Sequence, residues 1–390
     1  MNQRANEKNT ALCPVFRKCG GCQYIDMPYR EQLKRKQKQI CRLLSSFAEP
    51  EPIIGMDDPY HYRNKVSAAF ARDKKGNIIS GVYEEGSHRV VPVDRCLLED
   101  QRADAVIATI RGLLSSFKIP VYDEDRETGL LRHVLVRTGH ATGEIMVVPV
   151  TASPVFPSRR NFVRALTERH PEITTIVQNI NGRHTSMVLG PKMQVMHGRG
   201  YIEDILCGKR FRISPGSFYQ VNPVQTEVLY RTAVGYAGLT GKERVLDAYC
   251  GTGTIGLIAS DSAGEVIGVE LNPGAVKDAA INAENNHVKN IRFYRKDAGE
   301  FMRGLAARRE RVDVVFMDPP RSGSDRAFLE ALCTLRPARV VYISCNPETL
   351  ARDLRYVTRK GYRVERVQTV DMFPGTGHVE CVVLMSRGEK

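Results

Sequence analysis

Hydrophobic and polar positions along the chain change their period twice, and these changes divide it into three regions. Residues 29–47 contain no Gly or Pro and are rich in Gln, Lys, Leu and Arg, so they are predicted to form a helix. Short alternating or β-rich runs follow, punctuated by Gly and Pro, at 65–71, 81–83, 89–93, 130–138 and 144–150. Helical stretches near 100–117 and 158–169 interrupt them. This middle region is therefore predicted to be an α+β domain.

From residue 206 onward, apolar strand patterns alternate with helical ones. The predicted strands are 244–248, 265–270, 291–295, 312–318, 339–344, 362–371 and 379–386. Such alternation predicts a mostly parallel sheet of seven strands, wrapped by helices in a Rossmann-like α/β fold. Only the loop 373–377 joins the last two strands, so they should pair antiparallel. A ligand is expected at the carboxyl ends of the parallel strands.

The predicted organisation is a short N-terminal segment over 1–48, a smaller central α+β domain over 49–205, and an α/β domain over 206–390. A chain of 390 residues is long enough for two or three such units. No apolar run of 18 or more residues occurs, so no membrane span is expected. The polar first ten residues have no apolar core of a secretory signal, and a cytoplasmic location is expected.

The formal net charge of +13 favours a polyanionic partner, since neutralising phosphates releases condensed counterions. The predicted helix at 29–47 concentrates this charge. It could form a phosphate-contacting stripe or simply a solvated basic face. Its basic residues are Arg30, Lys34, Arg35, Lys36, Lys38 and Arg42.

The first strand of the third region ends in a glycine-rich turn. Gly251, Gly253 and Gly256 have the G-x-G-x-x-G spacing between a predicted strand and a helix, which lets the backbone approach a ligand closely. Glu270 ends the next strand, where a carboxylate can accept hydrogen bonds from both ribose hydroxyls. Asp297 could meet an adenine amine, or could be only a helix cap. Enzymes that use nicotinamide cofactors carry this glycine spacing too.

The fourth strand argues against a dehydrogenase because it ends in Asp318-Pro-Pro-Arg321, a rigid turn at the same pocket. Amino-group methyltransferases of nucleic acids use a similar turn. The fifth strand ends in Ser344-Cys345-Asn346-Pro347, which should expose the Cys345 thiol to the ligand crevice. Polar or basic neighbours are expected to lower the pKa of that thiol.

Glu380 opens the last predicted strand, which should lie beside the strand that ends at Cys345. A thiolate that adds to carbon 6 of uracil gives carbon 5 carbanion character, so that carbon 5 can attack a sulfonium methyl group. A base must then remove the carbon 5 proton. Cys345 and Glu380 are candidates for this nucleophile and this base, although Glu380 could also be an ordinary rim charge.

The chain resembles the family of RNA 5-methyluridine methyltransferases from about Cys13 to its C-terminus. The similarity lies in ordered motifs: Tyr62-Arg-Asn-Lys65, Ser214-Pro-Gly-Ser-Phe-Tyr-Gln-Val-Asn-Pro223, 247–256, 318–321, 344–347 and Gly377-His-Val-Glu380. The resemblance implies a Rossmann-like methyltransferase domain with a smaller β domain. It implies that Gln220, Tyr249, Glu270 and Asp318 bind S-adenosylmethionine, with Gly251 and Gly253 in the same pocket. It also implies Cys345 as nucleophile and Glu380 as base.

The spacing of the cysteines narrows the resemblance to one group within this family. The chain has ten cysteines, and the pattern Cys13-x5-Cys19-Gly-Gly-Cys22, with Cys96 further on, is similar to the four-iron four-sulfur site of the 23S ribosomal RNA enzymes. Four cysteines also suit tetrahedral zinc, which stays the alternative. Many relatives carry an N-terminal RNA-binding barrel of the TRAM type. Only twelve residues precede Cys13, so no such barrel is expected here.

The resulting hypothesis is a monomeric enzyme that methylates carbon 5 of a uridine in 23S ribosomal RNA. The target base must leave its stack to reach Cys345. Candidate RNA contacts in the central domain are Arg63, Lys65, Arg132, His133 and Arg137. The alternatives are the same reaction on a transfer RNA, a non-catalytic RNA-binding protein that keeps the fold, and an amino-group methyltransferase.

Overall fold

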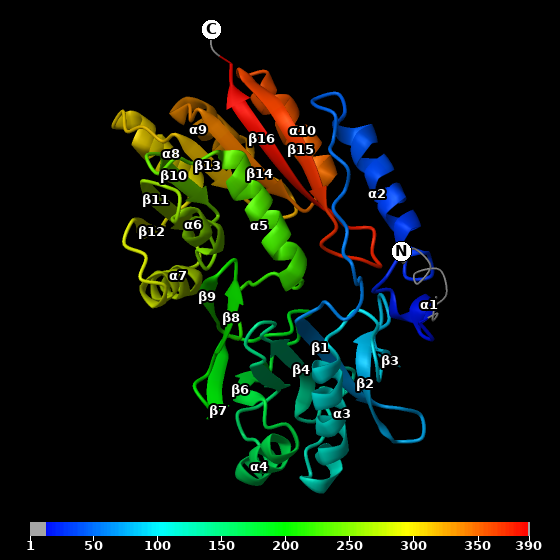
Figure 1. Cartoon of the computed structure of the whole chain (residues 1–390). Helices are drawn as coiled ribbons and strands as arrows, with labels where there is room; N and C mark the ends of the chain where they lie inside the picture. Colours follow the sequence, from blue (N-terminus) through cyan, green and yellow to red (C-terminus); the bar gives the residue numbers. More distant parts are fainter. Residues whose placement is uncertain (1–12, 389–390) are drawn as a thin grey trace, which may run out of the picture.

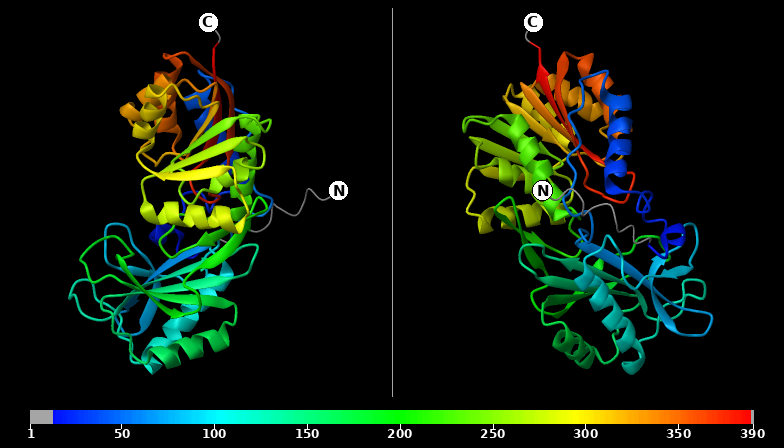
Figure 2. Two further views of the ribbon diagram at one scale, coloured as in Figure 1. Left: turned by 90° about the vertical axis from the view of Figure 1, so that its left-hand side faces the viewer. Right: turned by 45° about the vertical axis from the view of Figure 1, so that its right-hand side comes forward.

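A computed structural model describes residues 13–388 and places most of them around two large β-sheets. Figure 1 shows the two sheets one above the other, with α2 lying along the side of the upper one. We call them the N-terminal sheet, β1 to β7, and the C-terminal sheet, β10 to β16. Each has seven strands, and a two-stranded hairpin, β8 and β9, lies between them in the sequence. Figure 2 shows the two sheets from two further directions.

The N-terminal sheet has the strand order β3-β2-β1-β4-β5-β6-β7. Its strands are β1 (Lys65–Arg72), β2 (Ile78–Tyr83), β3 (Val90–Pro92), β4 (Leu131–Thr138), β5 (Ile145–Thr151), β6 (Ile173–Ile180) and β7 (Lys192–His197). All neighbours pair antiparallel except β5 and β6, which the helix α4 (Arg159–Arg169) connects. Helix α3 (Gln101–Ser116) buries Val106, Ile110 and Leu114 in the same core.

The sequence predicted β1 to β5 and both of these helices, but it missed β6, β7 and the hairpin of β8 (Ile202–Leu206) and β9 (Lys209–Ile213). The hairpin buries Ile202 and Phe211 in one core with Val245 of the C-terminal sheet. The predicted boundary between residues 205 and 206 therefore falls inside a strand. Leu135 and Met146 of the N-terminal sheet belong to the same core, so the hairpin packs with residues of both sheets.

The C-terminal sheet has the predicted seven strands in the order β12-β11-β10-β13-β14-β16-β15. They are β10 (Arg244–Ala248), β11 (Glu265–Glu270), β12 (Ile291–Arg295), β13 (Val314–Met317), β14 (Arg339–Ser344), β15 (Tyr362–Val370) and β16 (Glu380–Arg387). The helices are α5 (Pro223–Ala237), α6 (Thr254–Ala259), α7 (Pro273–Asn285), α8 (Ala298–Ala307), α9 (Arg326–Leu335) and α10 (Pro347–Thr358). Strands β10 to β14 pair in parallel, as the alternating pattern predicted.

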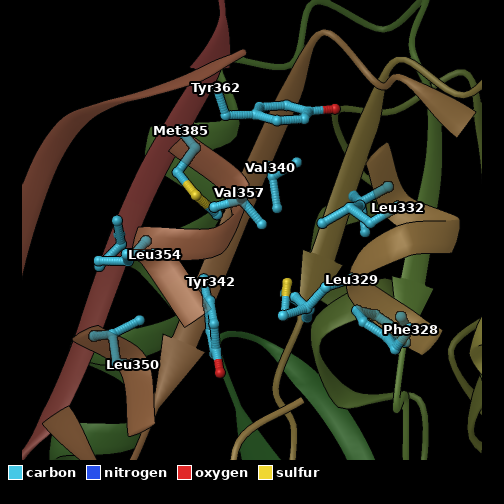
Figure 3. Packing of buried hydrophobic residues seen from close by; sticks show 14 of the residues in the cluster. Phe328, Leu329, Leu332, Val340, Tyr342, Leu350, Leu354, Val357, Tyr362 and Met385 are labelled. Carbon is cyan, nitrogen blue, oxygen red and sulfur yellow. The ribbon is translucent and has the colours of Figure 1, made fainter. Parts of the chain in front are cut away.

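Strand β16 runs against both of its neighbours, so the expected antiparallel pairing of the last two strands is confirmed. Its insertion between β14 and β15 brings Glu380 next to the end of β14. Apolar side chains from α9 and α10 cover this part of the sheet. Figure 3 shows Leu329, Leu354 and Val357 converging on Val340, Tyr342 and Met385. This packing holds the strand ends that carry the candidate site in a rigid frame.

The N-terminal segment packs on the C-terminal sheet. The short helix α1 (Phe16–Cys19) precedes α2 (Tyr29–Leu44), which lies against α10 and β15. Ile40 and Leu44 are fully buried in the core of the C-terminal sheet. Lys36, predicted as part of a basic stripe, is also fully buried and forms an ion pair with Asp371 at 2.6 Å. Lys36 cannot contact RNA phosphates, so that prediction is wrong for this residue.

Across residues 13–388, none of the helices combines the length and the apolar character that crossing a lipid bilayer requires.

Candidate active site

The candidate site lies at the carboxyl edge of the C-terminal sheet. Tyr249 follows β10, Glu270 ends β11, Asp318 follows β13 and Cys345 follows β14. The parallel registers of these strands bring their ends to the same edge. Residues distant in sequence therefore meet where an open α/β sheet binds its ligand.

The glycine-rich turn is built to let backbone approach a ligand. Gly251 and Gly253 have positive φ angles of 54° and 81°, and a Cβ added at Gly253 would lie 2.8 Å from the Phe293 ring. Tyr249 adopts the left-handed conformation as well, with φ of 65°. Glu270 supports the turn because its carboxylate accepts a hydrogen bond of 3.1 Å from the Gly251 amide.

A pocket with about 410 Å³ of empty space lies between this turn, α5 and the loop after β9. Gln220, Tyr249, Gly251 and Asp318 all line it, as predicted for a cofactor pocket. Glu270 and Gly253 adjoin the pocket through the glycine turn without lining it. Phe218 is 69% exposed at its wall, so an apolar ring is available to a bound ligand.

Asp297 caps a helix, which was the alternative to binding an adenine amine. Its side chain caps α8 by accepting a hydrogen bond of 2.9 Å from the Glu300 amide, and the residue is exposed. It does not line the pocket. The helix-cap interpretation is confirmed, and contact with an adenine ring stays a prediction.

Three acidic groups share the interior of the site. Burial raises the pKa of Asp318 to about 7. Burial, together with the charges of Asp318 and Glu270, raises the pKa of Asp247 to about 7. Burial and the charge of Asp318 raise the pKa of Glu380 well above its usual range. Concentrated negative charge in a dry pocket is unfavourable unless a cation enters, so the site is suited to a positively charged ligand.

The pairing of β14 with β16 brings Cys345 near Glu380. Ser344, the last residue of β14, pairs with Cys381, so Cys345 and Glu380 are the next residues along the two strands. The charges of Glu380 and Asp318 both act on the Cys345 thiol, which places the three groups together. This geometry agrees with the predicted neighbourhood of nucleophile and base.

The pKa of the Cys345 thiol is shifted in the direction opposite to the one predicted. Burial, reinforced by the charges of Glu380 and Asp318, raises it to about 11, and the opposing effect of Arg321 is smaller. The sequence analysis considered polar or basic neighbours of the thiol. It did not consider the two buried acids, whose effect on the pKa of Cys345 is larger than that of Arg321. A thiolate at Cys345 therefore needs positive charge supplied by a ligand, or protonated carboxyl neighbours.

A second hollow, with about 450 Å³ of empty space, opens directly over Cys345. Arg321, Asn346, Gly377 and His378 line it. Arg321 donates a hydrogen bond of 3.1 Å to Nδ1 of His378 and is itself held through its carbonyl, which accepts from Asn346. Asp318 lines the first pocket and acts on Cys345, so it connects the two hollows.

Sequence reasoning missed Tyr230. This residue of α5 is buried and lines the cofactor-type pocket together with Gln220 and Asp318. No motif in the sequence marks it, since the site reaches it only through the packing of α5 on the sheet. Arg321 and His378 stood inside recognised motifs, but their contact with each other was not foreseen.

The predicted metal ligands gather in one place. Cys13, Cys22 and Cys96 pack against a small apolar group formed by Ile25, Tyr62 and Leu98. Burial and the charges of Cys19 and Cys13 raise the pKa of Cys22 to about 11, so these thiols are neighbours. Among residues 13–388, however, no three Cys, His, Asp or Glu side chains converge closely enough to hold a metal ion.

Three of the five candidate RNA contacts in the central region are buried. Arg132 is 4% exposed and pairs with Glu124 at 2.7 Å, Arg137 is 4% exposed, and His133 is 9% exposed. The alternating strand pattern of β4 could not reveal that both of its faces are covered. The prediction is wrong for these three. Arg63 is half-buried and Lys65 is exposed, and an RNA contact stays a prediction for both.

Comparisons with known proteins agree with this geometry. The family model described as tRNA (uracil-5-)-methyltransferase matches residues 190–388. An RNA methyltransferase of Halalkalibacterium halodurans is 43% identical over 99% of this chain and 85% of its own length. Another, from Caldanaerobacter subterraneus, is 41% identical over 99% of this chain and 86% of its own length.

Among solved structures, the chain is similar to the Pyrococcus abyssi tRNA (uracil-54, C5)-methyltransferase in complex with S-adenosyl-L-homocysteine. The TM-score is 0.77 and the identity 28%, over 94% of this chain and 85% of the other. The match extends through both sheets, so the similarity covers more than the cofactor-type pocket.

Proposed function

Because this chain belongs to the tRNA (uracil-5-)-methyltransferase family and is thus an S-adenosylmethionine-dependent RNA methyltransferase, we propose that it methylates carbon 5 of a uridine in 23S ribosomal RNA, with Cys345 as nucleophile and Glu380 as base. The single observation that carries the mechanism is the nearness of Cys345 to Glu380 and Asp318, directly after the Ser344–Cys381 pair of β14 and β16.

The first pocket fits S-adenosylmethionine. That cofactor supplies a methyl group on a positively charged sulfonium, and the buried carboxyls of Asp318 and Asp247 compensate such a charge. The Gly251 backbone and the Tyr249 ring would hold the nucleoside end, with Glu270 reaching the ribose from behind the glycine turn. Gln220 would contribute to the wall of the same pocket, and Asp318, which also acts on Cys345, connects it to that thiol.

The proposed chemistry uses the two groups in sequence. The Cys345 thiolate adds to carbon 6 of the flipped uracil, and the electron pair of the ring double bond moves towards carbon 4. Carbon 5 would then accept the methyl group that the bound cofactor supplies, with a neutral thioether as the leaving group. Glu380 removes the carbon 5 proton, and the double bond re-forms as the bond between carbon 6 and the Cys345 sulfur breaks. Burial and the charge of Asp318 raise the pKa of Glu380, which makes its carboxylate a stronger proton acceptor once it is ionised.

A denaturing gel with labelled RNA tests this assignment. Cys345→Ala should abolish turnover while leaving S-adenosylmethionine binding unchanged. Glu380→Gln should accumulate a protein–RNA adduct, because methylated RNA stays attached to Cys345 when its proton cannot be removed. Cys333→Ala, a change of the same type on α9, should behave as wild type. Methylation by Cys345→Ala, or absence of an adduct with Glu380→Gln, would contradict the mechanism.

The ribosomal target rests on the cysteine pattern, while transfer RNA is the second candidate. The transfer RNA assignment is favoured by the 28% identity to an enzyme named for uracil-54 of tRNA. Mapping 5-methyluridine by mass spectrometry in both RNA classes, from a strain lacking the gene, distinguishes them. Loss of the modification from transfer RNA alone would remove the ribosomal proposal.

We further propose that Cys13, Cys19, Cys22 and Cys96 hold a four-iron four-sulfur cluster. The donor set suits a cluster, and the Cys96 sulfur already accepts a backbone hydrogen bond of 3.4 Å from Leu98, a contact common at cluster thiolates. The thiols would have to converge when the cluster forms. Protein purified without oxygen should be brown and contain iron and sulfide; zinc in their place would defeat the proposal.

A further inference from the structure

The loop between β15 and β16, residues 371–379, forms one wall of the hollow over Cys345. Gly377, His378 and Val379 line that hollow, and the chain then enters β16 at Glu380. The sheet ladder holds Glu380 itself through its pairing with Val370. It does not reach the loop residues between them. Something other than the sheet must therefore hold this wall in place.

Helix α5 holds the start of the loop, since Asn222 and Gln225 donate to the Met372 and Asp371 carbonyls, and Arg321 donates to His378. The N-terminal segment provides the contacts to the middle of the loop. The Gly375 carbonyl accepts hydrogen bonds from the backbone amides of Gln23 and Tyr24, at 3.1 and 2.9 Å. The Gly375 amide donates to the side-chain oxygen of Gln32 at 2.8 Å. The Gly377 amide donates to the side-chain oxygen of Gln23 at 3.1 Å. Figure 1 shows the loop lying beside the start of α2, far from it in sequence.

Two more carbonyls of the loop are bound in the same way. Lys36 donates to the Phe373 carbonyl at 3.1 Å, and the Tyr62 hydroxyl donates to the Pro374 carbonyl at 2.9 Å. In the described part of the chain, every hydrogen bond from outside the loop to the backbone of 373–377 comes from residues 23–62. The loop's remaining backbone bonds are internal, such as Thr376 to Phe373.

Packing makes the fit tight at Gly375. This residue has φ of +81°, and a Cβ added to it would lie 3.2 Å from Ile25 and 3.3 Å from Leu98. The loop is thus pressed against the apolar group beside the cysteines. Gln23 directly follows Cys22, so the hydrogen bonds to the loop start within the cysteine segment itself.

We propose that Gln23 and Gln32 are positioning residues for the methyl transfer reaction. They hold the loop so that its wall presses the uracil between Cys345 and Glu380. The inference rests on the proposed function and assigns the N-terminal segment a part in catalysis. Neither glutamine lines either hollow, so both act through the loop. Loosening the loop slows removal of the carbon 5 proton, and leaves cofactor binding unchanged.

Gln23→Ala is the cleanest test because Gln23 is exposed and its loss should not disturb folding. Removing one hydrogen bond should lower kcat about five-fold, and the double variant Gln23→Ala/Gln32→Met about twenty-five-fold, since each bond contributes about 1 kcal/mol. The dissociation constant for S-adenosylmethionine should not change. Part of the RNA should appear as covalent adduct, as with Glu380→Gln. Gln23→Glu should restore activity because a carboxylate oxygen can accept from Gly377.

Gln37→Ala is the matched control. It removes a glutamine of α2 whose hydrogen bonds go to Glu51 and Ile53, away from the loop, and it should keep normal kcat. Hydrogen exchange over residues 371–379 should speed up in Gln23→Ala and stay unchanged in Gln37→Ala. This readout holds even if the double variant folds poorly.

The outcomes separate the two proposals. If Glu380→Gln traps an adduct while Gln23→Ala shows normal kcat, no adduct and unchanged loop exchange, the positioning role is wrong. If Glu380→Gln traps nothing, the proposed mechanism itself fails. If Gln23→Glu does not restore what Gln23→Ala loses, the hydrogen bond to Gly377 is not the cause.

Discussion

At the scale of single residues, the site is defined by three buried acids. Asp318, Asp247 and Glu380 all have raised pKa values, and one oxygen of Asp247 is buried without a hydrogen-bond partner. Their burial costs free energy that a bound sulfonium would recover. Burial and two of these acids, Glu380 and Asp318, raise the pKa of Cys345, so cofactor binding and activation of the thiol should be linked.

Affinity for S-adenosylmethionine should rise with pH around neutrality. The pKa of Asp318 is about 7 in the free enzyme, and only its ionised form attracts the sulfonium. Binding should therefore release a proton, and the dissociation constant should fall about three- to tenfold between pH 6 and 8. Isothermal calorimetry in two buffers of different ionisation enthalpy measures both effects.

S-adenosylhomocysteine is the control for this titration, because it has the same amino group without the sulfonium charge. Its affinity should depend less on pH, and Asp318→Asn should reduce the dependence for both ligands. Equal pH dependence for the two ligands in the wild-type enzyme would remove the electrostatic argument.

At the scale of elements, α2 has different roles on its different faces. Gln32, Lys36, Ile40 and Leu44 form the buried face. Gln39 lines the hollow over Cys345, and the helical spacing puts the exposed residues Arg35 and Arg42 on the same side. The exposed Lys34 and Lys38 lie on another side, where they line an apolar groove with Pro50 and Pro52.

RNA should contact the side of α2 that faces the hollow. Arg35→Glu/Arg42→Glu should raise KM for RNA and flatten the dependence of log affinity on log salt by about 1.5, as expected for two lost phosphate contacts. Lys34→Glu/Lys38→Glu changes the net charge equally and should have a smaller effect. Filter binding at several salt concentrations compares the two. Equal effects would show that only overall charge matters.

At the scale of the whole molecule, contacts between distant parts of the chain complete the structure. Lys36 and Asp371 form an ion pair whose side chains are both 0% exposed, and Tyr29 donates to the second Asp371 oxygen at 2.9 Å. This network joins the N-terminal segment to the C-terminal sheet. A buried pair of this kind is costly to break, because one charge stays behind without a partner.

Lys36→Met should lower the free energy of unfolding by about 3–5 kcal/mol, as is typical when one partner of a buried pair is removed. Lys36→Met/Asp371→Asn should recover part of this loss, because no charge is then left buried. Lys34→Met, which breaks an exposed pair with Glu31 on the same helix, should leave stability unchanged. Urea unfolding followed by circular dichroism provides the measurement; equal stability of Lys36→Met and Lys34→Met would contradict the argument.

The elements that were missed share a physical cause. Strand β6 contains polar residues that break its apolar pattern, yet Gln178 and Asn179 are buried and hydrogen-bonded to Thr151 and Gly190. Strand β7 is an edge strand without a fully buried residue, and its alternating apolar residues Met193 and Val195 are exposed. Pattern reasoning detects strands that bury apolar side chains. It does not detect strands whose polar groups are satisfied by tertiary partners.

The sequence alone determined the C-terminal sheet and the residues at its edge. Alternating apolar runs predicted β10 to β16, and Cys345, Asp318 and Glu380 end or open these strands, because local pattern and covalent order decide both. Only the tertiary structure decided the pKa values of these residues and the contacts that hold them in place. The high pKa of Cys345 depends on acids from two other strands, and the loop before Glu380 is held by Gln23 and Gln32. Desolvation and contacts between distant segments exist only once the chain has folded.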